Sequence, residues 1–233
     1  FSEYSFPNRL KYISNFSGSA GMAIILKNKN FLFVDGRYTE QASIESGKNF
    51  KIFEIPKVRP FEVIKKIKHK LTLGFDPKLF TEISLKVNFK NICNLVPVNN
   101  NLVDEIFNLK NNNKIKEFYC LNKNIAGETI SSKLNRLSSI LKKKKINNIF
   151  ISAPENCAWL LNIRGFDNPN SPIPNCQLIL NNKQIYFFSD IRKINKIKNS
   201  IRYKKIKFYE FKEFPKVINN LKGKNFSIDR NSC

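Results

Sequence analysis

Short apolar runs alternate with polar turns along the first part of the chain, a pattern typical of an α/β domain. The runs that predict buried strands cover 22–26, 31–34, 51–55, 71–75 and 95–98. Apolar residues at helical spacing predict helices over 38–46, 60–69 and 79–89, the first closed by Gly47 and the last with Thr81 as a possible cap. The first two strands flank a polar turn, so we expect them to form a hairpin.

The second part repeats this alternation after a polar segment over 108–113, which we interpret as a linker. We therefore place domain boundaries at 1–110 and 111–233. The expected elements are a long amphipathic helix over 114–143, a strand over 149–152, an apolar stretch of ambiguous type over 157–161, a proline-rich loop over 168–174, a hairpin of 176–180 with 184–188, a helix from Asp190, a strand over 205–209, a helix over 214–221 and a strand over 226–228.

The two parts share an order of features that indicates an internal repeat. A segment centred on Tyr12 in the first part, and on Trp159 in the second, precedes a loop, a hairpin and an Asp-x-Arg triplet. The triplets are Asp35-Gly36-Arg37 and Asp190-Ile191-Arg192. A helix, a strand, a helix and a strand ending in Asp follow in both. We expect a duplicated α/β domain with mixed sheets flanked by helices, incomplete at both ends of the chain.

The chain carries a net charge of +23 and its isoelectric point is about 9.9. One interpretation is an electrostatic surface for nucleic acid or an anionic membrane. The favoured interpretation is codon bias, because Lys, Asn, Ile and Phe are abundant together and the Lys residues are scattered along the chain. The densest run, 142–145, falls at the end of a predicted helix, where cations are favourable. No apolar run is long enough for a transmembrane helix.

Metal and nucleophilic chemistry find little support in the residue pattern. The five Cys residues form no CxxC pair, which predicts reduced core thiols in a cytoplasmic protein. His69, the only histidine, lies in a basic segment with no clustered carboxylate. Ser19 has no partner base. The Gly18-Ser19-Ala20-Gly21 stretch offers either an anion cradle or, as we favour, a tight turn between strands.

Several strings resemble the aminopeptidase P, or Xaa-Pro aminopeptidase, family. Residues 9–25 read RLKYISNFSGSAGMAII and residues 31–42 read FLFVDGRYTEQA. The segment LVDEIF at 102–107 is similar to the end of the family's first domain, and residues 127–134 are similar to the start of its second. Residues 158–172 read AWLLNIRGFDNPNSP, similar to another family signature. The chain departs from the family pattern at Asn15, Phe107, Asn168 and Ser171.

The resemblance implies two creatinase-N-terminal-like domains followed, in the family, by a pita-bread catalytic domain. That third domain holds two metal ions, usually manganese, on two Asp, one His and two Glu, and the pair activates a water for amide hydrolysis. This ligand set cannot be placed here, so we expect no catalytic or metal residue in this part. The resemblance further implies a cytoplasmic homodimer that acts on peptides with proline second, without nucleic acid or membrane partners.

Arg37 and Arg164 are the candidate substrate-binding residues, because each lies at a strand end or in a glycine-ended loop. The competing and favoured interpretation is an internal salt bridge, of Arg37 with Asp35 or Glu40 and of Arg164 with Asp167. Trp159 is expected in the core, and Asn162 is expected to hydrogen-bond loop backbone.

The function that the sequence favours is the non-catalytic front part of a metal-dependent Xaa-Pro aminopeptidase, which restricts substrate access and supports dimerisation. The alternative is a stand-alone basic binding module, which would need lysines on one face with exposed aromatic residues between them. Creatinase or prolidase is a further alternative, which the tandem domain pair disfavours.

Overall fold

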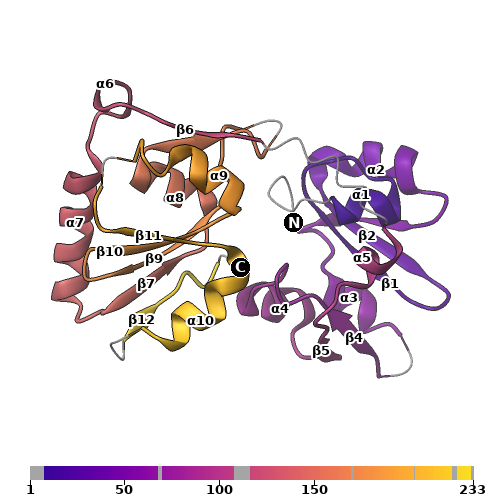
Figure 1. Ribbon diagram of the computed structural model, residues 1–233. Helices are drawn as coiled ribbons and strands as arrows, with labels where there is room; N and C mark the ends of the chain where they lie inside the picture. The colour runs from indigo at the N-terminus through magenta and orange to yellow at the C-terminus, as the bar shows by residue number, and fades with distance from the viewer. Residues whose placement is uncertain are drawn as a thin grey trace. The chain divides into compact units, whose positions relative to one another are not determined.

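The computed structural model describes residues 8–67, 70–107, 116–168, 171–201, 203–221 and 225–231 (Figure 1). The chain divides into two compact units, one up to Asn111 and one from Asn112. The predicted linker 108–113 and the predicted boundary within it lie outside the described residues, as does His69. Both units are of the α/β class, as the sequence predicts.

The first unit contains a three-stranded mixed sheet and a separate two-stranded parallel sheet. In the first sheet β1 runs antiparallel to β2, and β2 runs parallel to β3, because the helix α2 connects them. The elements are α1 (Arg9–Ser14), β1 (Gly21–Ile25), β2 (Asn30–Asp35), the 3-10 turn η1 (Gly36–Tyr38), α2 (Thr39–Ser46), β3 (Lys51–Ile55), α3 (Pro60–Ile64), β4 (Thr72–Phe75), α4 (Glu82–Phe89), β5 (Asn94–Pro97) and α5 (Leu102–Ile106).

The central strand β2 explains the core of the first unit, because its side chains alternate between two apolar layers. Leu32 and Val34 pack with Ala42 of α2, and both are fully buried. Phe33 points to the opposite layer, where it stacks on Phe53 of β3 with ring centroids 5.3 Å apart. A sheet covered on both faces requires this continuous apolar run rather than a polar–apolar alternation.

The second unit is built on a five-stranded mixed sheet in the order β11-β10-β9-β7-β12, with a two-stranded antiparallel ribbon of β6 and β8 beside it (Figure 1). The elements are β6 (Phe118–Cys120), α6 (Lys123–Ala126), α7 (Ile130–Lys143), β7 (Asn148–Ile151), α8 (Pro154–Leu161), β8 (Ile163–Gly165), β9 (Gln177–Asn181), β10 (Gln184–Phe188), α9 (Ile191–Ile197), β11 (Ile206–Tyr209), η2 (Phe211–Glu213), α10 (Phe214–Asn219) and β12 (Phe226–Ser227).

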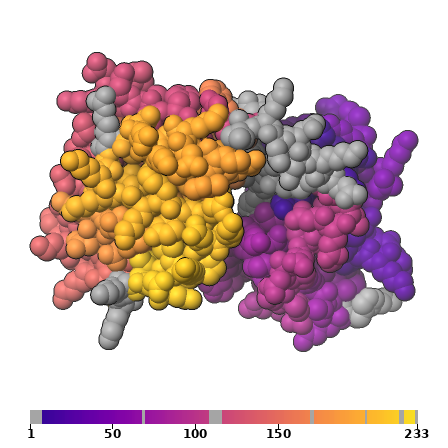
Figure 2. Space-filling view, in the orientation of Figure 1, coloured from indigo at the N-terminus to yellow at the C-terminus, as the bar shows by residue number. Residues whose placement is uncertain are grey.

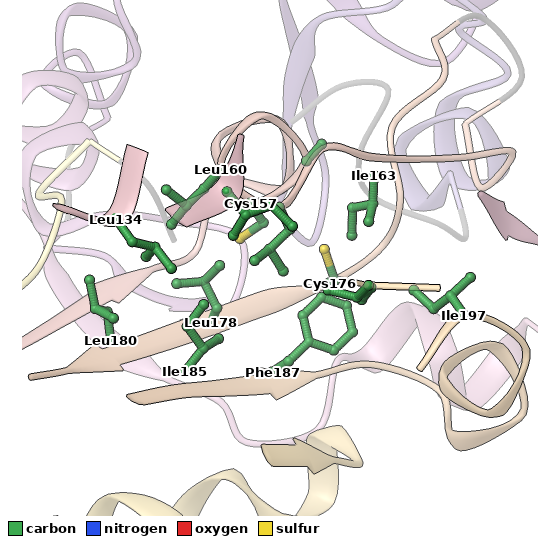
Figure 3. Close-up of a cluster of buried hydrophobic side chains, with 14 of the residues drawn as sticks. Leu134, Cys157, Leu160, Ile163, Cys176, Leu178, Leu180, Ile185, Phe187 and Ile197 are labelled. Atoms are coloured by element: carbon green, nitrogen blue, oxygen red, sulfur yellow. The ribbon is translucent and has the colours of Figure 1, made fainter. Parts of the chain in front are cut away.

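Helices cover both faces of this sheet. Leu134 of α7, Cys157 and Leu160 of α8 and Ile197 of α9 meet the side chains of β9 and β10, including Phe187, in one buried cluster (Figure 3). On the other face Phe188 packs against Phe214 and Val217 of α10. In Figure 2 the orange and yellow C-terminal part of this unit, which includes α9 and α10, forms much of its visible face.

The prediction of one long helix over 114–143 is wrong. The segment contains β6, the short helix α6 and only then α7. Two separate caps divide it, since the side chains of Asn122 and Thr129 each accept a bond from a backbone N–H three residues on. Gly127, at a φ of 75°, ends α6 between them. Residues 157–161, ambiguous in the sequence, belong to α8, which begins with Pro154 at its first position.

The predicted internal repeat is visible in matching local geometry. Both α1 and α8 end at an asparagine in the left-handed conformation, Asn15 with φ 63° and Asn162 with φ 52°. In both units an antiparallel hairpin then leads to a capping aspartate, a helix and a strand parallel to the hairpin's second strand. The turn of the second hairpin places Asn182 and Lys183 at positive φ, as a two-residue hairpin loop requires.

No helix among the described residues is long and apolar enough to cross a membrane.

Candidate functional site

Arg37 lies in η1, two residues after Asp35, the capping residue of that turn. The carboxylate of Asp35 accepts bonds from the backbone N–H of Arg37 at 3.0 Å and from its Nε at 2.7 Å. Hydrogen bonding to Arg37 lowers the pKa of Asp35. The ion pair with Asp35, one of the two predicted for Arg37, is therefore formed. The Arg37 side chain nevertheless remains 76% exposed, so the guanidinium is accessible from solvent.

Arg164 lies in β8, and its Nη1 donates to the carbonyl oxygens of Ile163 at 2.8 Å and Ala158 at 3.4 Å. Its predicted salt bridge with Asp167 is not formed. The Asp167 carboxylate instead accepts from Lys193 and from the backbone N–H of Asn175. Lys193 of α9 therefore pairs with Asp167 in place of Arg164, which is closer in sequence.

Trp159, expected in the core, is 51% exposed. The inward face of α8 is formed by Cys157, Leu160 and Leu161, and position 159 lies on the outward side of the same helix. The indole ring is covered on one side by the ammonium group of Lys133, 4.3 Å from the ring centroid. Trp159 thus lies at the surface, held by a cation.

Lys133 connects α7 to the end of α8 and is only 3% exposed. Its Nζ donates to the carbonyl oxygen of Trp159 and to Oδ1 of Asn162, both at 2.6 Å. Asn162 in turn donates through Nδ2 to the backbone carbonyl of Glu128 at 2.8 Å, which confirms the prediction that it bonds loop backbone. Burial lowers the pKa of Lys133, and Arg164 and Arg136 add to the lowering while the Glu128 carboxylate opposes it.

The ribbon of β6 and β8 carries a second group of exposed side chains beside Arg164. Tyr119 lies opposite Arg164 in the strand pair, and Phe166 follows two residues after Arg164. The rings of Tyr119 and Phe166 are 5.3 Å apart, and both are exposed. Phe118 and Ile163 of the same strands are buried. The outward side of the ribbon therefore presents an arginine beside a pair of neighbouring aromatic rings.

No group of three or more metal-ligating side chains occurs among the described residues, so they do not fit a metal centre. The hydroxyl of Ser19 shares a hydrogen bond with that of Tyr38 at 2.8 Å, and the glycine stretch around it joins α1 to β1 rather than two strands. Burial raises the pKa of Cys93, Cys120 and Cys176, which keeps these thiols protonated. Arg37 and Arg164 belong to different units, and each is placed only within its own.

Sequence reasoning missed Lys133, Tyr119 and Phe166. The signal for Lys133 was present, because it falls on the apolar face of α7 beside Ile130 and Leu134, where a lysine must find acceptors. The two aromatic residues carry no such signal, since period-2 patterning alone does not say which side of an isolated ribbon is covered.

The chain is a tandem α/β protein, in which each of two domains has a mixed sheet and an Asp-x-Arg cap. Models of the creatinase/prolidase N-terminal domain match residues 5–106 and, separately, residues 110–233. The chain belongs to the creatinase/prolidase N-terminal domain family and carries two copies of that domain.

Proteins named as Xaa-Pro aminopeptidases, or probable ones, are similar over most of the chain. A probable Xaa-Pro aminopeptidase P of Pyricularia oryzae is 33% identical over 185 residues, which cover 74% of this chain and 30% of that protein. The Xaa-Pro aminopeptidase ApepP of Drosophila melanogaster is 30% identical, over 80% of this chain and 32% of its own length.

The crystal structure of X-prolyl aminopeptidase from Caenorhabditis elegans, described as a cytosolic enzyme with a di-nuclear active site, matches with a TM-score of 0.80 and 26% identity. The match covers 94% of this chain and 37% of that one. The chain is thus homologous to the N-terminal region of Xaa-Pro aminopeptidases P and spans about a third of the length of these relatives.

Proposed function

We propose that this chain acts as the non-catalytic N-terminal part of a metal-dependent Xaa-Pro aminopeptidase, which removes the residue that precedes proline at a peptide's N-terminus. The observation that carries the proposal is the match of both units together to one X-prolyl aminopeptidase structure, over 94% of this chain. A tandem pair of these domains is more specific than a single copy, because it requires the same order of two folds in one chain.

The residues present indicate which tasks this chain and a catalytic domain would each perform. Hydrolysis of an unactivated amide needs an activated water, which two metal ions, proposed to be manganese, supply when bound in a catalytic domain. The described residues offer no such ligand set. Their proposed work is to restrict access to the catalytic site, so that short peptides are favoured, and to support dimerisation of a cytoplasmic enzyme. We place the domain boundary between residues 110 and 111.

Arg37 and Arg164 are the proposed contacts to the peptide substrate. Arg37 supports this by its accessibility, since its ion pair with Asp35 uses Nε and leaves the side chain 76% exposed. Arg164 supports it by lacking a carboxylate partner among the described residues while lying beside two exposed aromatic rings. Guanidinium groups suit peptide carboxylates and carbonyl oxygens because their donors are fixed in a plane.

The test is an assay of the complete polypeptide that contains this chain, with manganese, on Ala-Pro-Ala and on Ala-Ala-Ala. We expect cleavage of the first peptide only, and no cleavage by the 233-residue chain alone. Arg37→Ala and Arg164→Ala in the complete protein are expected to raise KM several-fold. Arg192→Ala, in the equivalent capping triplet of the second unit, serves as the matched control.

A complete protein that folds, binds metal and cleaves neither peptide would contradict the proposal. It would favour a basic binding module for anionic partners, which the net charge of +23 motivates. Against that alternative, Phe16, Phe33, Phe187 and Phe188 are all fully buried, so many of the aromatic residues belong to the core.

A further inference from the structure

The second unit contains a local excess of positive charge around Arg164. Three carboxylates lie near it in the fold, and each has its own cation. Glu117 pairs with Lys196, Asp167 with Lys193, and Glu128 with Arg136. The described residues therefore supply no direct carboxylate contact to Lys133 or to Arg164, whose donors meet neutral carbonyl and amide oxygens, although the charge of Glu128 acts on Lys133 from further away.

This excess is unfavourable in the absence of a ligand, because charges removed from water need a counter-charge or full solvation. Lys133 is almost completely buried, and Arg164 is half-buried against the end of α8. The two cations also oppose each other, since Arg164 contributes to the lowered pKa of Lys133. An anion placed at Arg164 would relieve both effects. Lys133 would strengthen its binding through the field without touching it.

The surroundings of Arg164 indicate which kind of anion fits. We call the outward side of the ribbon, formed by Tyr119, Arg164 and Phe166, the Arg164 face. Tyr119 lies directly opposite Arg164 in the strand register, Phe166 lies two residues further along, and their exposed rings, 5.3 Å apart, form one apolar surface beside Arg164. A small inorganic anion would leave that apolar surface uncovered. A carboxylate attached to an organic chain would bond to the guanidinium and cover the rings.

We propose that the Arg164 face binds an acidic peptide segment, with a carboxylate on Arg164 and the adjoining apolar part of the peptide on Tyr119 and Phe166. A single recessed charge favours one carboxylate over a nucleic-acid backbone, which needs a line of exposed cations along its phosphates. The inference deepens the role proposed above for Arg164, and it rests on that function only for the identification of the peptide as a substrate.

Binding can be measured directly on the 233-residue chain, because Trp159 is its only tryptophan and lies beside the site. Lys133 covers its ring, and Arg164 bonds to the carbonyl of the preceding residue, Ala158. The probe is the blocked tripeptide acetyl-Glu-Phe-Glu-amide, and its matched control is acetyl-Gln-Phe-Gln-amide. We expect the acidic peptide to change the Trp159 fluorescence and to bind at least tenfold more tightly than the neutral one.

Two variants distinguish the site from general charge attraction. Arg164→Gln is expected to weaken binding of the acidic peptide about tenfold, whereas Arg192→Gln, which removes the same charge elsewhere in this unit, should change it less than twofold. Because Arg164→Gln also loses the bond to α8, its thermal unfolding is measured in parallel. Glu128→Gln removes a nearby negative charge and is expected to tighten binding several-fold, a result that misfolding cannot produce.

Equal binding of the acidic and neutral peptides would overturn the proposal, as would unchanged or weaker binding by Glu128→Gln. Inorganic phosphate that displaces the peptide at equal concentration would reduce the site to a simple anion site. Tighter, Arg164-dependent binding of oligo-dT would assign the face to single-stranded nucleic acid. Acidic-peptide binding by this chain without Ala-Pro-Ala cleavage by the complete protein would leave the inference standing and remove the aminopeptidase function.

Discussion

The helix that ends at a left-handed asparagine occurs once in each unit, and its surroundings differ. Three residues before the asparagine stands an aromatic residue, Tyr12 in the first unit and Trp159 in the second. Tyr12 is held by residues of its own unit, with its hydroxyl donating to the carbonyl of Ile106 and its ring 4.2 Å from that of Phe107. Trp159 is held by a buried lysine, with Arg136 farther from its ring, and is 51% exposed.

The position two residues after the asparagine shows the same contrast in charge. In the first unit it is Ser17, whose backbone N–H and hydroxyl both donate to the carboxylate of Glu45 at 2.7 Å. In the second unit it is Arg164, with no carboxylate from the described residues. The first copy therefore supplies its own anion from α2. The second copy presents a cation at the corresponding place, so the two copies share a backbone conformation and differ in the charge placed on it.

The largest expected effect tests whether the two cores are equivalent. Phe33 and Phe188 lie two residues before the capping aspartates, are fully buried, and each stacks on a ring of the parallel neighbouring strand. Phe33→Ala and Phe188→Ala should each lower the free energy of unfolding by about 3–5 kcal/mol, because a large cavity replaces the ring.

Urea unfolding followed by circular dichroism measures both variants, and Trp159 fluorescence adds a reading from the second unit. Ile44→Ala, at a position 78% exposed, is the control and should change stability by less than about 0.5 kcal/mol. A loss below about 1 kcal/mol in only one of the two phenylalanine variants would show that the cores are not equivalent.

Sequence patterning predicted the two larger sheets well because their inner strands, such as β2, β9 and β10, are short apolar runs that are mostly buried. The hairpins, the strand 51–55 and the place of the Asp-x-Arg triplets after the hairpins follow from local chemistry that few alternatives satisfy. It failed over 114–143, where an amphipathic pattern runs on while Asn122, Gly127 and Thr129 interrupt the backbone. The apolar spacing there predicts one continuous helix, whereas the capping residues predict helix ends. The capping residues prevail because each allows a backbone group at a helix end to be hydrogen-bonded.

The candidate site was predicted less well than the fold, for reasons that depend on distant partners. Asp167 was the obvious partner for Arg164 by proximity in sequence, but Lys193, on α9, occupies it. Trp159 was expected in the core, but its position on α8 places it on the outward side of that helix. The ion pair of Arg37 was predictable because both partners lie within one turn. An ion pair between residues close in sequence can be inferred from the sequence. Competition from a residue that only the fold brings near cannot.

The two asparagines allow a sharper test of the comparison. Both have positive φ, which glycine adopts without strain. Asn15→Gly should therefore change stability by less than about 0.5 kcal/mol. Asn162→Gly should cost about 2–3 kcal/mol, because it removes an acceptor from the buried Lys133 and a donor to the carbonyl of Glu128.

Urea midpoints of the two glycine variants measure this difference directly. The double variant Asn162→Gly with Lys133→Met supplies the control, since the second change removes the cation that the first leaves partly unsatisfied. We expect the two changes to be non-additive by about 1 kcal/mol or more. Equal costs at positions 15 and 162 would mean that backbone conformation alone explains both residues.

A smaller effect is expected where the first unit supplies its own carboxylate. Ser17→Ala and Glu45→Gln should each lower stability by about 1 kcal/mol, because they remove or weaken hydrogen bonds to a charged acceptor. Bonding to Ser17 lowers the pKa of Glu45, so the carboxylate is the form that the site prefers. A double-mutant cycle checks the coupling, and a coupling energy of zero would remove Glu45 from the comparison.

The smallest expected effect concerns the capping triplets, which the two units share. Bonds from Arg37 and Arg192 lower the pKa of Asp35 and Asp190 below that of an unfolded chain. A carboxyl group whose folded pKa is depressed stabilises the fold above its unfolded pKa, near 3.9, and loses this contribution as pH falls through the folded value. Stability should therefore fall as pH drops below about 4, and Asp→Asn at either site should flatten that fall.

The Asp190 cap should contribute more to stability against acid than the Asp35 cap, and this difference gives the finest test of the repeat. The Asp190 carboxylate accepts from both Nε and Nη2 of its arginine, whereas that of Asp35 accepts from Nε alone among the side-chain donors. Asp190→Asn should therefore reduce the loss of stability below about pH 4 more than Asp35→Asn does. Adding 0.5 M NaCl should weaken both effects, because the ion pairs are exposed to solvent. Urea midpoints at pH 5 and pH 3 measure this loss of stability. A larger effect at Asp35 would show that the second bond of Arg192 contributes nothing in solution, and that the shared backbone bond to each aspartate carries the cap.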